Sequence, residues 1–126
     1  MTSEPVHYLS LIDVSARLRS GDLKPTTLTE MILARIAQYD GALKSYTTLL
    51  ADRAMAKARE AEAELNRGFW RGPLHGVPIS VKDLCYTDYA PTAAGCSSIR
   101  TSFRLTPAPW WSALNAPGRS SLASCR

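Results

Sequence analysis

The sequence predicts an α/β fold in which helices outnumber strands. Three segments carry apolar residues at helical spacing, and two shorter segments have the composition or alternation that is typical of strands. Their order along the chain is helix, helix, strand, helix, strand. With 126 residues, the chain is at most one small domain with a modest core.

The composition is that of a globular protein and excludes several functional classes. Apolar residues make up 45% and charged residues 21% of the chain, which is not the composition of a disordered protein. No apolar run approaches the ~20 residues that span a membrane. The first residues lack the basic start and apolar core of a signal peptide. We therefore expect a cytoplasmic protein that contacts no membrane.

The positive net charge is concentrated near the C-terminus. Residues 1–100 have a net charge of +1, whereas residues 101–126 contain three arginines and no acidic residue. This distribution does not form a basic groove, so no nucleic-acid partner is expected. Cys85, Cys96 and Cys125 are an odd number of cysteines without C-x-x-C spacing. Their pattern argues against a disulfide framework or a zinc site.

Two helices are predicted at the start of the chain. Residues 9–20 carry apolar side chains at helical spacing, with Ser10 as a capping residue. A second helix is expected to open at Pro25, with a capping box at Thr27–Glu30, and to end before Gly41. We interpret both helices as scaffold.

A short strand and the clearest helix of the chain follow. Residues 46–50 are rich in β formers, and residues 51–67 form an alanine-rich segment with one apolar face. Glu60, Glu62 and Glu64 of this helix could be imagined as a metal cluster. Their alternate spacing spreads the carboxylates around the helix axis, so we interpret them as part of a solvated face.

The stretch that carries the functional prediction is residues 72–83. Glycine and proline residues flank a short apolar run that ends at Lys82. Strand alternation places Ile79 and Val81 on one side, and Ser80 and Lys82 on the other.

Lys82 and His75 are the two candidate bases of this stretch. A lysine at a strand end is usually a solvated surface group. Here the apolar strand, the tight turns and Asp83 are expected to remove water from the ammonium of Lys82. Loss of water favours the uncharged amine, which can act as a general base. We interpret His75, which lies in a turn, as a packed or hydrogen-bonded structural residue.

Residues 73–83 read P-L-H-G-V-P-I-S-V-K-D, and residues 91–95 read P-T-A-A-G. This pattern resembles the amidase signature family, and the similarity runs from about residue 8 to residue 95. The resemblance implies an α/β fold with a mixed sheet flanked by helices, of which residues 1–100 would form the N-terminal part. It also implies hydrolysis of a small-molecule carboxylic amide to an acid plus ammonia or an amine, without a cofactor.

The resemblance further implies a Ser–Ser–Lys triad whose lysine is Lys82. In that family the uncharged lysine accepts a proton, through a middle serine, from the serine that attacks the amide carbonyl. Both family serines lie in a glycine- and serine-rich segment farther along the chain. The pairs Ser97-Ser98 and Ser120-Ser121 lack that context. Lys82 is therefore the single catalytic residue assigned, and the 126 residues alone are expected to be catalytically incompetent.

Residues 101–126 do not follow the family pattern and show neither helical nor strand periodicity. A shifted reading frame joins the third base of each codon to the first two bases of the next. The codons permitted for residues 101–126 allow this frame to be translated as T-V-V-E-R-L-E-R-A-G-A-V-I-L-G-K-L-Q. That string has the helix-then-strand pattern typical of the family at this point. We hypothesise a frameshift around residues 101–106. The alternative is a genuine short tail, usually disordered, in which Trp110-Trp111 could anchor a partner.

Two other functions stay open from the sequence. The A subunit of a glutamine-dependent tRNA amidotransferase is similar to the amidases in its triad, and nothing in residues 1–100 separates the two. A small non-catalytic helical interaction module would use His75, Pro78 and Lys82 only as turn and surface residues. The sequence predicts neither the identity of the amide nor a partner subunit.

Overall fold

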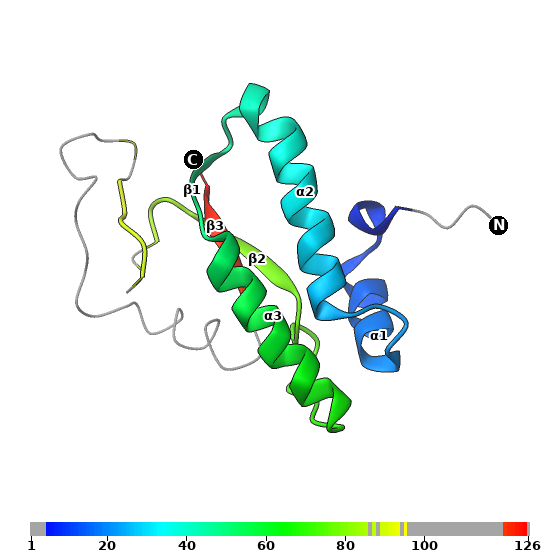
Figure 1. Ribbon diagram of the computed structural model, residues 1–126. Helices are drawn as coiled ribbons and strands as arrows, with labels where there is room; N and C mark the ends of the chain where they lie inside the picture. Colours follow the sequence, from blue (N-terminus) through cyan, green and yellow to red (C-terminus); the bar gives the residue numbers. More distant parts are fainter. Residues whose placement is uncertain (1–4, 86, 88, 94, 96–119, 126) are drawn as a thin grey trace.

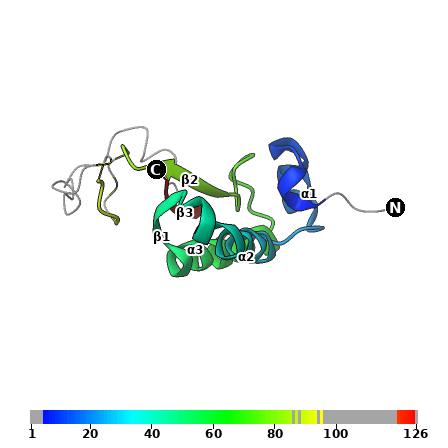
Figure 2. The same ribbon diagram turned by 90° about the horizontal axis from the view of Figure 1, so that it is seen from above.

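The computed structural model describes residues 5–85, 87, 89–93, 95 and 120–125. A 3-10 turn at Val6–Tyr8 is followed by α1, α2, β1, α3, β2 and β3 in that order (Figure 1). Helices α2 and α3 run side by side and lie on the same side of the sheet (Figure 2). Helix α1 stands apart from the sheet, next to the loop that leads into β2.

Helix α1 spans Leu11–Ser20 and confirms the first predicted helix. The hydroxyl of Ser10 accepts a hydrogen bond from the Asp13 N–H at 3.1 Å and donates one to the Asp13 carboxylate at 2.6 Å. This reciprocal pair satisfies one of the N–H groups that a helix start leaves without a partner. Val14 and Leu18 turn inward and join Leu28 and Val77 in a small core.

Helix α2 spans Pro25–Leu43, and the predicted capping box is wrong. The N-cap is Lys24, and the orphan N–H of Thr26 is directed to a carboxylate of the next helix, Glu62, at 3.4 Å. The Thr26 hydroxyl donates to the same carboxylate. A tertiary contact therefore replaces the local cap. The helix also continues past Gly41, because its Asp40 carboxylate caps the turn that follows through the Ser45 N–H at 2.6 Å.

Helix α3 spans Ala51–Asn66, as predicted to within one residue. Ala54, Ala58 and Ala61 are fully buried. Because their side chains end at Cβ, a neighbouring helix can approach closely along this face. The alanine face of α3 lies against α2 and the sheet, which explains why a helix with few large apolar residues packs stably in the layer.

The sheet is mixed and has the strand order β1-β3-β2. Strand β1 (Tyr46–Leu49) pairs antiparallel with β3 (Ser120–Cys125), and β3 pairs parallel with β2 (Pro78–Lys82). In register, Cys125 is opposite both Tyr46 and Lys82. The predicted α/β class, with a mixed sheet flanked by helices, is thus present in this piece.

The sequence did not predict a strand after residue 101, and β3 corrects that expectation for Ser120–Cys125. Strand pairing uses backbone N–H and C=O groups, which are available whatever the side chains are. A segment of low β propensity can therefore take the place between two strands that need partners. Residues 96–119 and 126, including Trp110-Trp111 and the expected site of the frameshift, lie outside the described residues.

Candidate functional site

Lys82 is the last residue of β2, at the edge of the three-stranded sheet. The predicted alternation is present, since Ile79 and Val81 are half-buried whereas Ser80 and Lys82 are exposed. The expected removal of water from the ammonium is not found within the described residues, because Lys82 remains exposed there. Apolar neighbours along a strand point to its opposite face and do not cover the lysine.

The segment after Lys82 folds back and holds the end of β2. The Lys82 carbonyl accepts a hydrogen bond from the Cys85 N–H at 2.8 Å. The carboxylate of Asp83, which is only 4% exposed, accepts one from the Ala93 N–H at 3.2 Å. The hydroxyl of Thr92 donates to the Cys85 carbonyl at 3.1 Å. The backbone of Lys82 is therefore anchored, while its side chain faces solvent.

Two hydroxyl groups lie close together on the face of β2 that carries Lys82. The phenol oxygen of Tyr46 in β1 is 3.3 Å from the hydroxyl of Ser80. Ser80 precedes Lys82 by two residues, so both side chains leave the strand on the same face. The face that presents the lysine thus also offers hydrogen-bonding groups.

His75 is a structural residue, as predicted, and is 1% exposed. Its Nδ1 accepts a hydrogen bond from the Arg71 N–H at 3.2 Å, and its Nε2 lies 3.0 Å from Oε2 of Glu64. The second contact brings the Glu64 carboxylate against the ring edge without good hydrogen-bond geometry. Burial lowers the pKa of His75 below its ordinary value of 6.5, although the Glu64 carboxylate opposes this effect.

Glu64 and Arg71 are residues that the sequence interpretation missed. Arg71 donates from Nε to Oε2 of Glu64 at 2.7 Å and from its terminal nitrogen to Oε1 at 2.6 Å. These hydrogen bonds hold the pKa of Glu64 below its ordinary value of 4.5. A paired fork of this kind is stronger and more directional than a single ion pair.

The interpretation of the acidic run as a solvated face is wrong for two of its three members. Glu62 binds the start of α2, and Glu64 binds Arg71 and His75. The third residue, Glu60, pairs with Lys57 of its own helix at 2.6 Å. An arginine and a histidine in the loop just after a helix were the available signal, since they can fold back onto its last turn.

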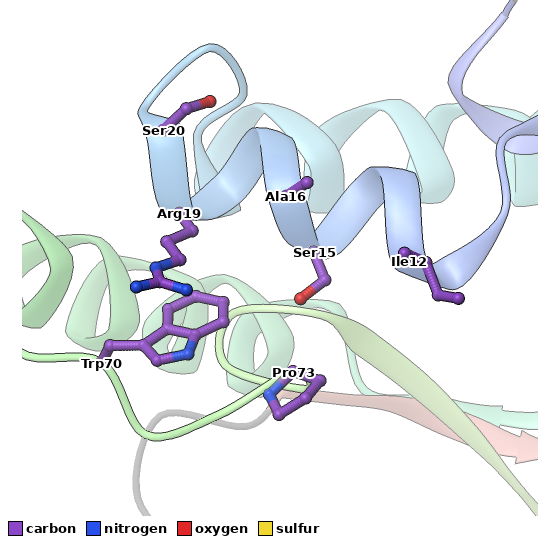
Figure 3. A pocket seen from close by; sticks show the side chains of 7 residues that line it. All are labelled: Ile12, Ser15, Ala16, Arg19, Ser20, Trp70 and Pro73. Carbon is purple, nitrogen blue, oxygen red and sulfur yellow. The ribbon is translucent and has the colours of Figure 1, made fainter.

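An open cavity of about 530 Å³ lies between α1 and the loop before β2. Figure 3 shows Arg19 of α1 over the indole of Trp70, Ser15 extending from α1 toward the loop that carries Pro73, and Ile12 at one end. The Arg19 guanidinium carbon is 5.9 Å from the centre of the indole ring. No residue of β2 lines this cavity, so it is separate from Lys82.

The described residues also bear on metal binding and membrane insertion. No group of three or more His, Cys, Asp or Glu side chains there has an arrangement that could hold a metal ion. None of the helices in that part of the chain has the length and hydrophobicity needed to cross a membrane. Cys85 is a free, half-buried thiol. Ser97 and Ser98 lie outside the described residues.

Comparison with known proteins gives consistent results. The family model described as Amidase matches residues 27–121. AmiD of Mycobacterium tuberculosis, whose name assigns it to the amidases, is 44% identical over 100 residues, which is 79% of this chain and 21% of AmiD. The A subunit of the glutamyl-tRNA(Gln) amidotransferase from Chloroflexus aurantiacus is 39% identical over 99 residues, or 79% of this chain and 20% of that protein.

Solved structures of amidases share the fold. The structure of the native peptide amidase from Stenotrophomonas maltophilia superposes with a TM-score of 0.87 and 33% identity, covering 97% of this chain and 25% of that one. The chain spans about one fifth of the length of the curated relatives that it matches. The family match covers most of the 126 residues and includes the whole of β2. The chain therefore belongs to the amidase family, and its structure is that of part of an amidase-signature enzyme.

Proposed function

We propose that this chain is the N-terminal portion of an amidase that hydrolyses a carboxylic amide, with Lys82 as the base of a Ser–Ser–Lys triad. The observation that carries the proposal is the string P-L-H-G-V-P-I-S-V-K-D at residues 73–83, in a chain of the amidase family. The resemblance gives Lys82 the role of taking a proton, through a middle serine, from the attacking serine.

The geometry around Lys82 supports this role. Its backbone is anchored on both sides by β2 and by the Asp83–Ala93 hydrogen bond, and its side chain leaves the sheet at an exposed edge. A catalytic base has to be held in place while its reacting atom remains accessible to its partner. A serine-bearing segment that packs on this edge would remove water from the ammonium, which the residues described here do not do.

The remaining triad members are not assigned within residues 1–126. Ser97, Ser98, Ser120 and Ser121 lack a glycine-rich context. A lysine without its nucleophile has no route for acyl transfer. We therefore propose that the 126 residues alone hydrolyse no amide, and that the activity belongs to a longer polypeptide.

We further propose that residues 1–100 are the family portion and that residues 101–126 are read in a shifted frame, although the family model itself also matches residues up to 121. The position of β3 supports this division. In the shifted reading, the mostly apolar string V-I-L-G-K is read across codons 119–124, almost the same positions as the central strand Ser120–Cys125. A central strand is usually apolar, which the shifted string is and the printed one is not. The coding DNA decides the matter, because absence of V-I-L-G-K from its alternative frame eliminates the hypothesis.

A second candidate is the A subunit of a tRNA-dependent amidotransferase. The 39% identity to such a protein from Chloroflexus aurantiacus favours it. That enzyme class would take ammonia from glutamine and pass it on, whereas a simple amidase would release it. Membership of an enzyme family leaves no observation in favour of the helical interaction module.

A chimaera tests the role of Lys82. Residues 27–95 of this chain replace the structurally matching segment of the Stenotrophomonas maltophilia peptide amidase, and hydrolysis of a peptide amide is measured. Lys82→Ala is expected to lower kcat/KM by at least about 10³-fold, which is typical of the loss of a general base. The control is Lys57→Ala, which removes a helix-surface lysine paired only with Glu60 in the described structure. Unchanged activity of Lys82→Ala would remove Lys82 from the mechanism.

A further inference from the structure

The last turn of α3 holds the loop that leads into β2. Glu64 uses both carboxylate oxygens for this purpose: Oε1 accepts from Arg71, and Oε2 accepts from Arg71 and faces His75. The Glu64 side chain is 11% exposed and that of His75 is fully buried. The carboxylate is therefore sheltered, although the Arg71 side chain that pairs with it is 32% exposed. Two hydrogen bonds hold Arg71 to the helix, and the buried His75 ring packs against the same carboxylate.

The hydrogen bonds of His75 define its tautomer. Nδ1 accepts from the Arg71 N–H and therefore carries no proton. In the neutral ring the proton then lies on Nε2, which faces the Glu64 carboxylate. Protonation of Nδ1 would set two N–H groups against each other. The contacts with Glu64 and Arg71 thus select one state of the ring.

The residues between this cluster and β2 have little freedom. Gly76 has a φ of +77°, and a Cβ at that position would lie 2.8 Å from Cγ of Pro25 at the start of α2. Val77 is buried in the same core cluster as Leu18 and Leu28. Strand β2 begins at the next residue, Pro78. The place where β2 starts is therefore set by how His75 and Gly76 are held.

We propose that Glu64 is a positioning residue for Lys82: by holding Arg71 and His75, it sets where β2 begins and so where the lysine at its end is placed. The inference rests on the proposed function of Lys82 as the base. Glu64 is a residue of α3 that holds the loop before β2, at the opposite end of the strand from Lys82. In this role it does not contact the reacting groups. It acts through the loop alone.

Hydrogen exchange in the 126-residue chain tests the positioning. Glu64→Gln keeps the size of the side chain but removes the charge that pairs with Arg71 and faces His75. The control is Glu60→Gln, one turn earlier on the same helix, where the carboxylate forms an ion pair with Lys57 and acts on Arg71 only as a more distant charge, weaker than Glu64. We expect Glu64→Gln to raise the exchange rates of β2 amides by about tenfold, as expected for loss of one hydrogen bond to a charged group. Amides in the middle of α2 should change much less, and Glu60→Gln should change neither.

Two results would overturn the inference. Equal acceleration in β2 and α2 would mean that Glu64 contributes only to overall stability, and no acceleration would mean that the loop is held without it. If Glu64→Gln does not fold, the unaltered chain still decides through the ¹⁵N signals of its histidine rings. The Nε2–H tautomer of His75 is expected, and the Nδ1–H tautomer would contradict the cluster as described. A His7→Gln variant identifies which signals belong to His75.

Kinetics in the chimaera separate this inference from the proposed function. With Lys82 as the base, Glu64→Gln should lower kcat by about tenfold and leave KM unchanged, because the base is misplaced while the substrate site is intact. A rise in KM alone would contradict positioning of the base. If Lys82→Ala leaves activity unchanged, the proposed function fails, whereas the exchange and tautomer results still stand or fall independently.

Discussion

Replacement of Gly76 by alanine tests how closely the helices hold the start of β2. Gly76 has a φ of +77°, in the left-handed region where a Cβ is strained. An added Cβ would lie 2.8 Å from Cγ and 3.1 Å from Cβ of Pro25, and 3.7 Å from Cβ of Ala61. Pro25 is fully buried and its ring cannot rotate away. The added methyl group therefore meets both strain and a steric clash.

The two costs can be estimated separately. The left-handed conformation costs a residue with a Cβ about 1–2 kcal/mol, and overpacking in a core costs about 1–3 kcal/mol more. Gly76→Ala should thus lower the free energy of unfolding by about 2–5 kcal/mol. The control is Gly21→Ala, since Gly21 has a φ of +84° but no atom within 4 Å of the added Cβ. It should show the strain cost alone.

Urea unfolding of the 126-residue chain, followed by far-UV circular dichroism, measures both variants. The free energy of unfolding is obtained by linear extrapolation, and the slope shows whether the unfolding transition itself has changed. A loss for Gly76→Ala that clearly exceeds the loss for Gly21→Ala supports the close approach to Pro25. Equal losses for the two variants would refute it.

Two further outcomes follow from the described contacts. Stability should fall on acidification. The pKa of His75 is lower in the folded chain, so below pH 6.5 the unfolded chain binds a proton before the folded chain does, and stability decreases. The pKa of Glu64 is also lower in the folded chain, so further stability is lost below pH 4.5 as pH falls through the folded value. Urea midpoints that do not fall from neutral pH to pH values below these two would contradict this. Glu62→Ala should destabilise the chain by about 1 kcal/mol through loss of the α2 cap. Glu60→Ala should cost less, because its ion pair with Lys57 is partly exposed and lies within one helix. Equal effects would argue against the cap.

Periodicity predicted the parts of the fold that depend on which face of an element is apolar. The alanine face of α3 and the alternation of Ile79 and Val81 against Ser80 and Lys82 both follow from spacing along the chain. Ser10 capped its helix as expected, because its partner is only three residues away. In each of these cases the physics is local.

The features that the sequence did not predict depend on contacts between distant segments. Thr27 does not cap α2, because Glu62, 36 residues beyond Thr26, provides the cap instead. Glu64 is inconspicuous on its helix until the following loop brings Arg71 and His75 onto it. Strand β3 arises from pairing with β1 and β2 and not from its own side-chain pattern. Local patterns carry no information about such partners.

The central claim is that Lys82 is the base of an amidase triad. Its most direct test is the ratio of kcat/KM between the Lys82→Ala and Lys57→Ala forms of the peptide amidase chimaera, measured on one peptide amide. We predict that Lys57→Ala keeps the activity of the unaltered chimaera, whereas Lys82→Ala falls at least about 10³-fold below it. A correctly folded Lys82→Ala chimaera with the same kcat/KM as the Lys57→Ala control would contradict the claim.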